Sequence, residues 1–299
     1  MILHVENIYK SYGKENVLKG VSFSIEKPEI IALVGPNGSG KTTLLNVITN
    51  LLHADEGKVR ILGKKNSNPK TFLEISFMQD NSVLYDYLTA YDHLQFIAQV
   101  QGLPKKRIIE TAERVGMDSY LNKRVKSFSL GMKQHLLFAM AIINQPKLLI
   151  LDEPLNGLDP TSAIRVRELL LALQKEGTAI LLSSHNLAEI DRVTSSVLFL
   201  KEGQLIEENL KEFEEVHYEI SVDDEEKAKQ VLETASIFVN FTKGHIFLNC
   251  EEYNLHDTLK VLTSNGVSVI SIERKILGSE ERYRRYFAEE LQFENIENI

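Results

Sequence analysis

The feature that most constrains this chain is an eight-residue pattern of the form G-x-x-x-x-G-K-T at residues 35–42. An apolar run at residues 30–34 precedes it and predicts a buried strand, and a helix is expected to begin near Lys41. Gly35, Gly38 and Gly40 let the backbone curl so that its N–H groups point inward at phosphate oxygens. The helix that follows adds the positive end of its dipole. The pattern therefore predicts a site for the phosphate chain of a nucleotide.

Two sets of side chains complete this predicted site. Lys41 is expected to neutralise the β- and γ-phosphates, and the Thr42 hydroxyl is expected to coordinate Mg²⁺. Asp152 and Glu153 follow a second apolar run at residues 148–151, so Asp152 suits a Mg²⁺ ligand and Glu153 could orient an attacking water. The remaining loop residues that we expect to bind the nucleotide are Asn37, Ser39 and Thr43.

Composition describes a globular chain of ordinary type. A chain of 299 residues is expected to form one large or two unequal domains. Its composition, with 43% hydrophobic and 25% charged residues, excludes a wholly disordered protein. No apolar run approaches the roughly 18 residues that a membrane span needs, and the first residues do not resemble a signal peptide. The single cysteine, Cys250, excludes an intramolecular disulfide and favours a reducing cytosol.

The net charge of −8 is unevenly spread. Residues 207–229 contain ten acidic side chains against three lysines, a net charge of −7. Such a segment argues against a nucleic-acid surface, which needs clustered Lys and Arg, and favours a solvated acidic hinge between two domains.

The apolar pattern divides the chain near residue 210. Before it, continuous apolar runs at residues 30–34, 148–151 and 179–183 and a hairpin at residues 197–206 predict an α/β domain, residues 1–208, with a sheet buried on both faces. Residues 81–145 instead have helical periodicity and predict a helical insertion. After residue 216 the order strand, helix, two strands, helix, strand predicts a small ferredoxin-like α+β domain, residues 216–291.

Within this second domain we expect strands at 217–222, 237–241, 245–248 and 267–272, with a turn at Lys243-Gly244. Helices are expected at 224–235 and 254–264, and residues 279–291 predict a further charged helix.

Further motifs resemble those of ATP-binding-cassette (ABC) ATPases. The run S-F-S-L-G-M-K-Q at residues 127–134, with Ser129 and Gly131, is similar to the family's signature motif. Gln79 looks like the Q-loop glutamine, Asp159 in N-G-L-D resembles the D-loop aspartate, and His185 looks like the switch histidine. The resemblance covers roughly residues 2–207, and the motifs follow in the family's order.

The resemblance implies roles that the residues alone do not show. Glu153 would be the general base or water-orienting carboxylate, and His185 would hold the γ-phosphate and connect it to Glu153. Gln79 would sense Mg²⁺ and the attacking water while contacting a membrane subunit, and Tyr12 would stack on adenine. Ser129 and Gly131 would cap the γ-phosphate of an ATP bound by the opposite subunit, and Asp159 of the D-loop would also belong to the nucleotide-binding residues.

The resemblance also implies partners. Two chains would close head to tail around two ATP molecules, the second chain being a copy or a paralogous ATPase. They would drive a separately encoded transmembrane permease from the cytoplasmic face of the plasma membrane, with no nucleic acid expected. The S-L-G-M-K-Q form resembles exporter ATPases of bacitracin and lantibiotic self-protection, although Leu130 and Met132 replace the usual glycine and glutamine.

Two other functions stay open at this point. The chain could be a soluble ABC ATPase that acts on DNA or ribosomes, but it has one cassette, no long coiled-coil insertion and no basic stripe. Alternatively, the chain could be a regulatory binding module in which residues 216–291 sense a small ligand or a partner, either as the main function with ATPase activity secondary or as a role added to ATP hydrolysis.

Overall fold

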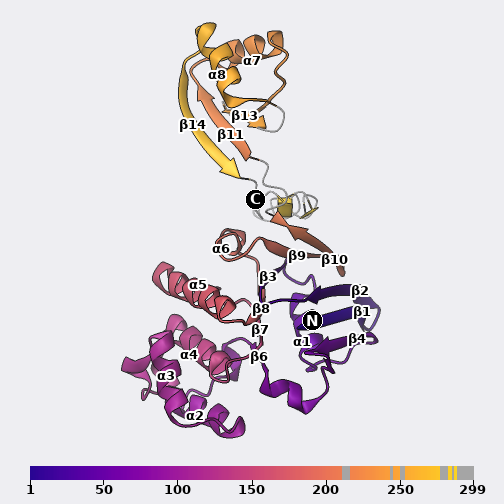
Figure 1. Cartoon of the computed structure of the whole chain (residues 1–299), viewed down its shortest axis with the longest axis vertical. Helices are drawn as coiled ribbons and strands as arrows, with labels where there is room; N and C mark the ends of the chain where they lie inside the picture. Colours follow the sequence, from indigo (N-terminus) through magenta and orange to yellow (C-terminus); the bar gives the residue numbers. More distant parts are fainter. Residues whose placement is uncertain (211–215, 243–244, 250–252, 277–281, 285, 288–299) are drawn as a thin grey trace. The chain divides into compact units, whose positions relative to one another are not determined.

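The chain separates into two units, residues 1–208 and residues 209–299. The computed structural model describes residues 1–210, 216–242, 245–249, 253–276, 282–284 and 286–287 (Figure 1). The expected turn at residues 243–244 lies outside the described residues, as do much of the expected helix at 279–291 and residues 211–215 of the expected hinge.

A six-stranded sheet forms the centre of the first unit. Its strands, in spatial order, are β10 (Gln204–Asn209), β9 (Ser196–Lys201), β3 (Ile30–Val34), β8 (Ala179–Ser184), β7 (Leu148–Leu151) and β6 (Ile75–Met78). The five strands from β9 to β6 are parallel, and β3, β7 and β8 are buried along their whole length. Burial on both faces explains their continuous apolar runs and confirms the predicted α/β fold.

A second, antiparallel sheet of the first unit was not predicted from the sequence. It contains β2 (Glu15–Ile25), β1 (Leu3–Tyr12), β4 (Glu56–Ile61) and β5 (Lys64–Lys65), in that spatial order. Register shifts interrupt the pairing of β1 between Val5 and Ile8, and Asn7 there has a φ of 49°. The irregularity breaks the apolar–polar alternation by which a half-buried strand is recognised.

Helix α1 (Lys41–Ile48) packs in the core between these two sheets (Figure 1). Its fully buried Leu44, Leu45 and Ile48 belong to one apolar cluster with residues from β1, β2 and β4 and from β3, β7 and β8. Helix α5 (Pro160–Lys175) lies on the other side of the six-stranded sheet. The core therefore holds the first turn of α1 at the carboxyl end of β3.

Three helices lie between β6 and β7 in the sequence, namely α2 (Ala90–Val100), α3 (Lys106–Val115) and α4 (Leu130–Ile142). They pack against one another, and fully buried Leu94, Ile108 and Phe138 contribute one side chain from each helix to the buried interior. A capping box at Thr89 and Asp92 begins α2. These helices form the predicted insertion, and its short connections contain 3₁₀ turns.

The second unit has the element order that the sequence predicted. It runs β11 (Val216–Val222), α7 (Glu225–Thr234), β12 (Asn240–Thr242), β13 (His245–Asn249), α8 (Leu255–Ser264) and β14 (Val269–Ile276). The strands pair antiparallel in the order β12-β13-β11-β14. Strand β12 is shorter than the expected 237–241, because Ile237 and Val239 pack against the apolar core without joining the ladder. The ferredoxin-like assignment stays a prediction.

We predict that replacing Gly57 by alanine destabilises the first unit, because a Cβ at this residue of β4 would lie 2.3 Å from the Asn7 carbonyl oxygen. The residue also has a φ of +98°, so backbone strain adds to the overlap. Together they should cost about 3 kcal/mol of unfolding free energy.

Gly63→Ala is the matched control, because Gly63 has a similar φ of +76° with no atom within 4 Å of the added Cβ. It should cost only about 1 kcal/mol. Urea denaturation followed by circular dichroism measures both changes, and equal losses in the two variants would contradict the close-packing argument.

Candidate functional site

The phosphate loop, residues 35–40, connects the carboxyl end of β3 to the first residue of α1, as the sequence predicted. Gly40 caps the helix in a left-handed conformation with a φ of 102°. A Cβ at this position would lie 2.9 Å from Cγ1 of Val17 on β2. Both the dihedral angle and the close contact require glycine here.

Lys41 is buried with its side chain folded back into the loop. Its Nζ donates hydrogen bonds to the carbonyl oxygens of Gly35, at 2.7 Å, and Pro36, at 3.0 Å. Burial lowers the pKa of this ammonium group, while the nearby carboxylates of Glu153 and Asp152 oppose the shift. A phosphate oxygen would offer this cation a negatively charged partner in place of neutral carbonyls.

Asp152 connects three segments that are distant in sequence. Its Oδ2 accepts a hydrogen bond from Thr42 Oγ1 at 2.9 Å, and its Oδ1 accepts one from Ser183 Oγ at 2.5 Å. The same Ser183 oxygen accepts a hydrogen bond from the backbone N–H of Glu153 at 2.9 Å. The hydroxyl on β8 therefore holds both acidic residues at the end of β7.

Glu153 and His185 contact each other directly, with His185 Nδ1 2.8 Å from Glu153 Oε2. His185 follows the end of β8, whereas Glu153 follows β7 by two residues and has a φ of 50°. Gln79 follows β6, the strand paired with β7, where the backbone N–H of Asp152 donates to the Met78 carbonyl at 3.0 Å. The ends of three adjacent parallel strands thus bring Gln79, Asp152, Glu153 and His185 to one edge of the sheet.

A hollow of about 300 Å³ opens above the phosphate loop. Its lining residues are Val17, Asn37, Gly38, Gly40, Lys41, Thr42, Thr43 and Glu153. Ser39 lies within the loop with a buried hydroxyl, and Gly35 provides one of the carbonyls that bind Lys41. Tyr12, at the end of β1, is 51% exposed and does not line the hollow, and Lys10 Nζ lies 5.8 Å from the centre of its ring.

Ser129, Gly131 and Asp159 form a second cluster, where α4 and α5 both begin. Ser129 caps α4 and Asp159 caps α5 through their side chains. Asp159 Oδ2 accepts a hydrogen bond from Ser162 Oγ at 2.7 Å, and hydrogen bonds from Ser162 lower the pKa of its carboxyl. A Cβ on Gly131 would lie 3.3 Å from the same Ser162 hydroxyl.

None of these three residues lines the phosphate-loop hollow, as far as the described residues extend. One chain therefore presents the predicted site in two separate parts.

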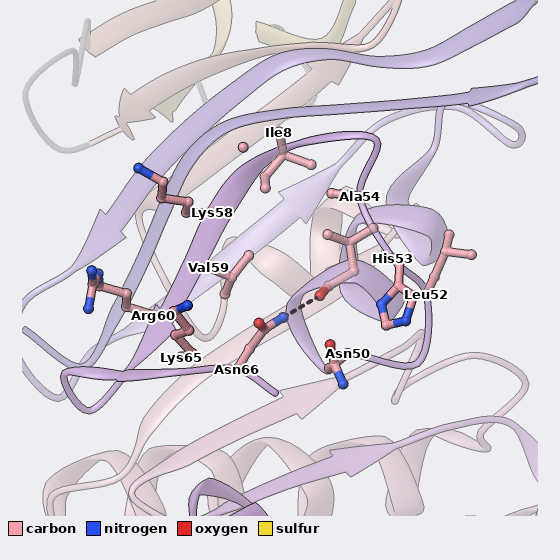
Figure 2. A pocket seen from close by; sticks show the side chains of 12 residues that line it. Ile8, Asn50, Leu52, His53, Ala54, Lys58, Val59, Arg60, Lys65 and Asn66 are labelled. Atoms are coloured by element: carbon pink, nitrogen blue, oxygen red, sulfur yellow. Dashed lines mark hydrogen bonds between the residues drawn. The ribbon is translucent and has the colours of Figure 1, made fainter. Parts of the chain in front are cut away.

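Another hollow, of about 330 Å³, lies beside the carboxyl end of α1 and the antiparallel sheet (Figure 2). Ile8 and Val59 lie on its apolar side, and Asn66 Nδ2 donates to the Val47 carbonyl at 2.9 Å. Figure 2 shows Lys58 and Arg60 directed away from the centre of the view, on the outer side of β4. Its lining contains no predicted site residue, so it is distinct from the phosphate-loop hollow.

Two residues of the site were not predicted from the sequence. Ser183 lies near the end of an apolar strand, directly before Ser184 and His185. A polar residue in a buried strand is the sequence signal that could have identified Ser183 as a site residue. Val17 gave no signal, because its contact with Gly40 depends on how β2 packs against the loop.

Comparison with known proteins identifies the family. Residues 18–156 match the ABC transporter family. The chain is 33% identical over 300 residues to the bacitracin transport ATP-binding protein BcrA of Enterococcus faecalis, covering 96% of this chain and 95% of that protein. It is 38% identical over 205 residues to the lantibiotic transport ATP-binding protein SrtF of Streptococcus pyogenes, covering 69% of this chain and 89% of the relative.

A solved structure has the same fold as the first unit. It is an ATP-binding cassette in a dimeric, post-hydrolysis state bound to ADP and phosphate, 27% identical, with a TM-score of 0.63. The match covers 70% of this chain and 98% of the solved one. Within the described part of the chain, no helix is both long and apolar enough to cross a membrane. The phosphate loop, the order of the motifs and these similarities show that the chain belongs to the ABC transporter family, as an ATP-binding and ATP-hydrolysing subunit.

Proposed function

We propose that this ATPase powers an antibiotic exporter whose membrane pathway is a separately encoded permease. The similarity to the bacitracin transport protein carries this proposal, because it extends over 96% of the chain and so includes the second unit. The lantibiotic transport protein supports the same class of cargo. The chain would then act at the cytoplasmic face of the plasma membrane, held there by its permease.

The site residues would divide the chemistry between binding and water activation. Backbone N–H groups of residues 35–40, the first turn of α1 and Lys41 would bind the phosphates of ATP. Glu153 would orient the attacking water and accept its proton, while His185, 2.8 Å from Glu153, would keep that carboxylate in place and contact the γ-phosphate. Tyr12 would stack on adenine, and this contact would require Tyr12 to lie against the base when ATP is bound.

Thr42 and Asp152 suit a Mg²⁺ ion that accompanies ATP. Their oxygens lie 2.9 Å apart, and hydroxyl and carboxylate oxygens are the hard ligands that Mg²⁺ prefers beside phosphate oxygens. Bound Mg²⁺ would neutralise charge on the β- and γ-phosphates. Gln79, at the end of the strand next to Asp152, would respond to the occupied site.

The separation of the two clusters supports a head-to-tail dimer. Ser129, Gly131 and Asp159 form a surface of their own, with the N-terminus of α4 available for an anion. In such a dimer this surface would close over the ATP on the partner's phosphate loop. Closure would complete the site only when ATP is bound, so hydrolysis would reopen the dimer and move the permease. The partner could be a copy of this chain or a paralogous ATPase.

The transport proteins among the relatives favour this function over a soluble ATPase that acts on DNA or ribosomes. The antiparallel βαββαβ unit at residues 216–276 supports a ferredoxin-like accessory domain.

Replacing Glu153 by glutamine should lower ATP turnover by about 100-fold or more, because the amide cannot accept the proton of the attacking water. ATP binding should persist, since Lys41 and the loop are unchanged, and the ATP-bound dimer should accumulate. Phosphate release and light scattering with ATP and Mg²⁺ measure the two effects. Glu176→Gln, at the opposite end of α5 from Asp159, is the matched control, and parental turnover in Glu153→Gln would refute the assigned role.

Replacing Ser183 by alanine should lower kcat about 10-fold, because Asp152 and the Glu153 N–H each lose a hydrogen-bond partner in a buried strand. ATP affinity should change less, since the phosphate loop keeps its contacts. Ser76→Ala removes another strand serine, whose Oγ donates to Asn144 Oδ1 at 2.9 Å. Equal kcat values for the two variants would show that the Ser183 hydrogen bonds do not position Glu153.

The transporter assignment has its own test. Tagged Glu153→Gln protein, purified from its native cells in mild detergent with ATP and Mg²⁺, should bring down a polypeptide with several membrane spans. Ribosomal or nucleic-acid components without a membrane protein would refute the transporter function. Antibiotic sensitivity of cells that lack this permease would then identify the cargo.

A further inference from the structure

His185, which binds the γ-phosphate in the proposed function, lies just before a very short helix in the chain. This helix, α6 (Leu187–Ile190), has four residues. A helix of one turn is not stable on its own, so tertiary contacts must fix its position. Ile190, which is fully buried, provides one such contact.

Glu189 provides the second contact, through an ion pair with Arg167 of α5. Both side chains are largely buried, with exposed fractions of 13% for Arg167 and 17% for Glu189. The other carboxylate oxygen of Glu189 lies 3.4 Å from Nη1 of Arg192, which is 60% exposed. Because a buried charge is costly without its partner, the Arg167 contact specifies where Glu189 lies far more strongly than the exposed Arg192 contact.

Two hydrogen bonds from backbone N–H groups to side-chain oxygens connect Glu189 to the neighbours of His185. The Glu189 N–H donates to Asn186 Oδ1 at 3.3 Å, and the Asn186 N–H donates to Ser184 Oγ at 3.0 Å. Asn186 and Ser184 are the two neighbours of His185 in the chain. The ion pair therefore restrains the residues on both sides of the histidine.

Arg167 also connects this segment to the second cluster, since α5 begins at the cap Asp159, beside Ser129 and Gly131. Between α5 and α6 lies a hollow of about 300 Å³, lined by Leu155, Leu158, Arg167, Asn186 and Glu189 among others. The hollow separates the residues before α5 from α6. Close packing therefore does not by itself hold α5 and α6 together here, and the Arg167–Glu189 ion pair connects them.

We infer that Arg167 and Glu189 are positioning residues, which orient His185 and couple it to the start of α5. Neither residue lines the phosphate-loop hollow. The inference depends on the proposed function in one respect only, namely that a change in the orientation of His185 should change ATP turnover. The orientation of His185 itself is independent of that role and is measured separately.

The test replaces Arg167 by methionine in the full-length chain and compares it with Arg167→Lys, which keeps a cation. Arg167→Met should lower kcat about 10-fold while the KM for ATP changes less than about 3-fold, because a misplaced group reduces turnover more than binding. Arg167→Lys should retain most of the turnover. Arg114→Gln, which breaks the exposed pair with Glu176 at the other end of α5, is the matched control and should leave kcat unchanged.

The second measurement records the ring resonances of ¹³C-labelled histidines, with the His185 signal identified by its loss in His185→Ala. Arg167→Met should shift this signal, whereas Arg114→Gln should not. An unshifted His185 signal in folded Arg167→Met protein overturns the inference, whatever happens to kcat. A shifted signal with parental kcat supports the positioning role and instead refutes the role of His185 in the proposed function.

Thermal unfolding establishes whether each variant is folded. If Arg167→Met does not fold, Glu189→Gln replaces it, because the amide keeps the size of the side chain and removes its charge. The same two outcomes for the His185 signal then decide the inference.

Discussion

The Asp152 carboxylate is the contact on which the arrangement of this site depends. It accepts hydrogen bonds from Thr42 on α1 and from Ser183 on β8, and it directly follows β7, which lies between β8 and β6. Those bonds hold the loop at residues 35–40, the first turn of α1 and the end of β8 beside Asp152, and Glu153 and His185 lie at the same edge of the sheet. The carboxylate reaches both hydroxyls because β8 lies between β7 and β3, and α1 begins directly after the loop that follows β3.

Two parts of the site remain apart in a single chain, and this separation has a physical reason. Ser129 and Asp159 cap two helices that begin beside each other, so their position is set by how the helical insertion packs against α5. The phosphate loop is set instead by the core between the two sheets. Groups held by different elements can move relative to one another, and the Arg167–Glu189 pair connects α5, which Asp159 caps, to α6, which follows His185 in the chain.

Much of the first unit followed from local sequence. The continuous apolar runs of β3, β7 and β8 predicted a buried parallel sheet, and the phosphate loop was placed correctly between β3 and α1. The antiparallel sheet was missed, because bulges in β1 remove the alternation of a half-buried strand. In the second unit β12 was predicted too long, since Ile237 and Val239 are apolar for packing rather than for strand pairing.

The sequence by itself determined which chemistry the chain can perform. Residue type and spacing along one strand and one turn, both of which are local, carry the roles proposed for Gly40, Lys41, Thr42, Asp152 and Glu153. Only the tertiary structure decided that Ser183 holds both acids and that Arg167 reaches Glu189. These contacts join residues brought together by sheet order and helix packing, so no spacing in the sequence encodes them directly.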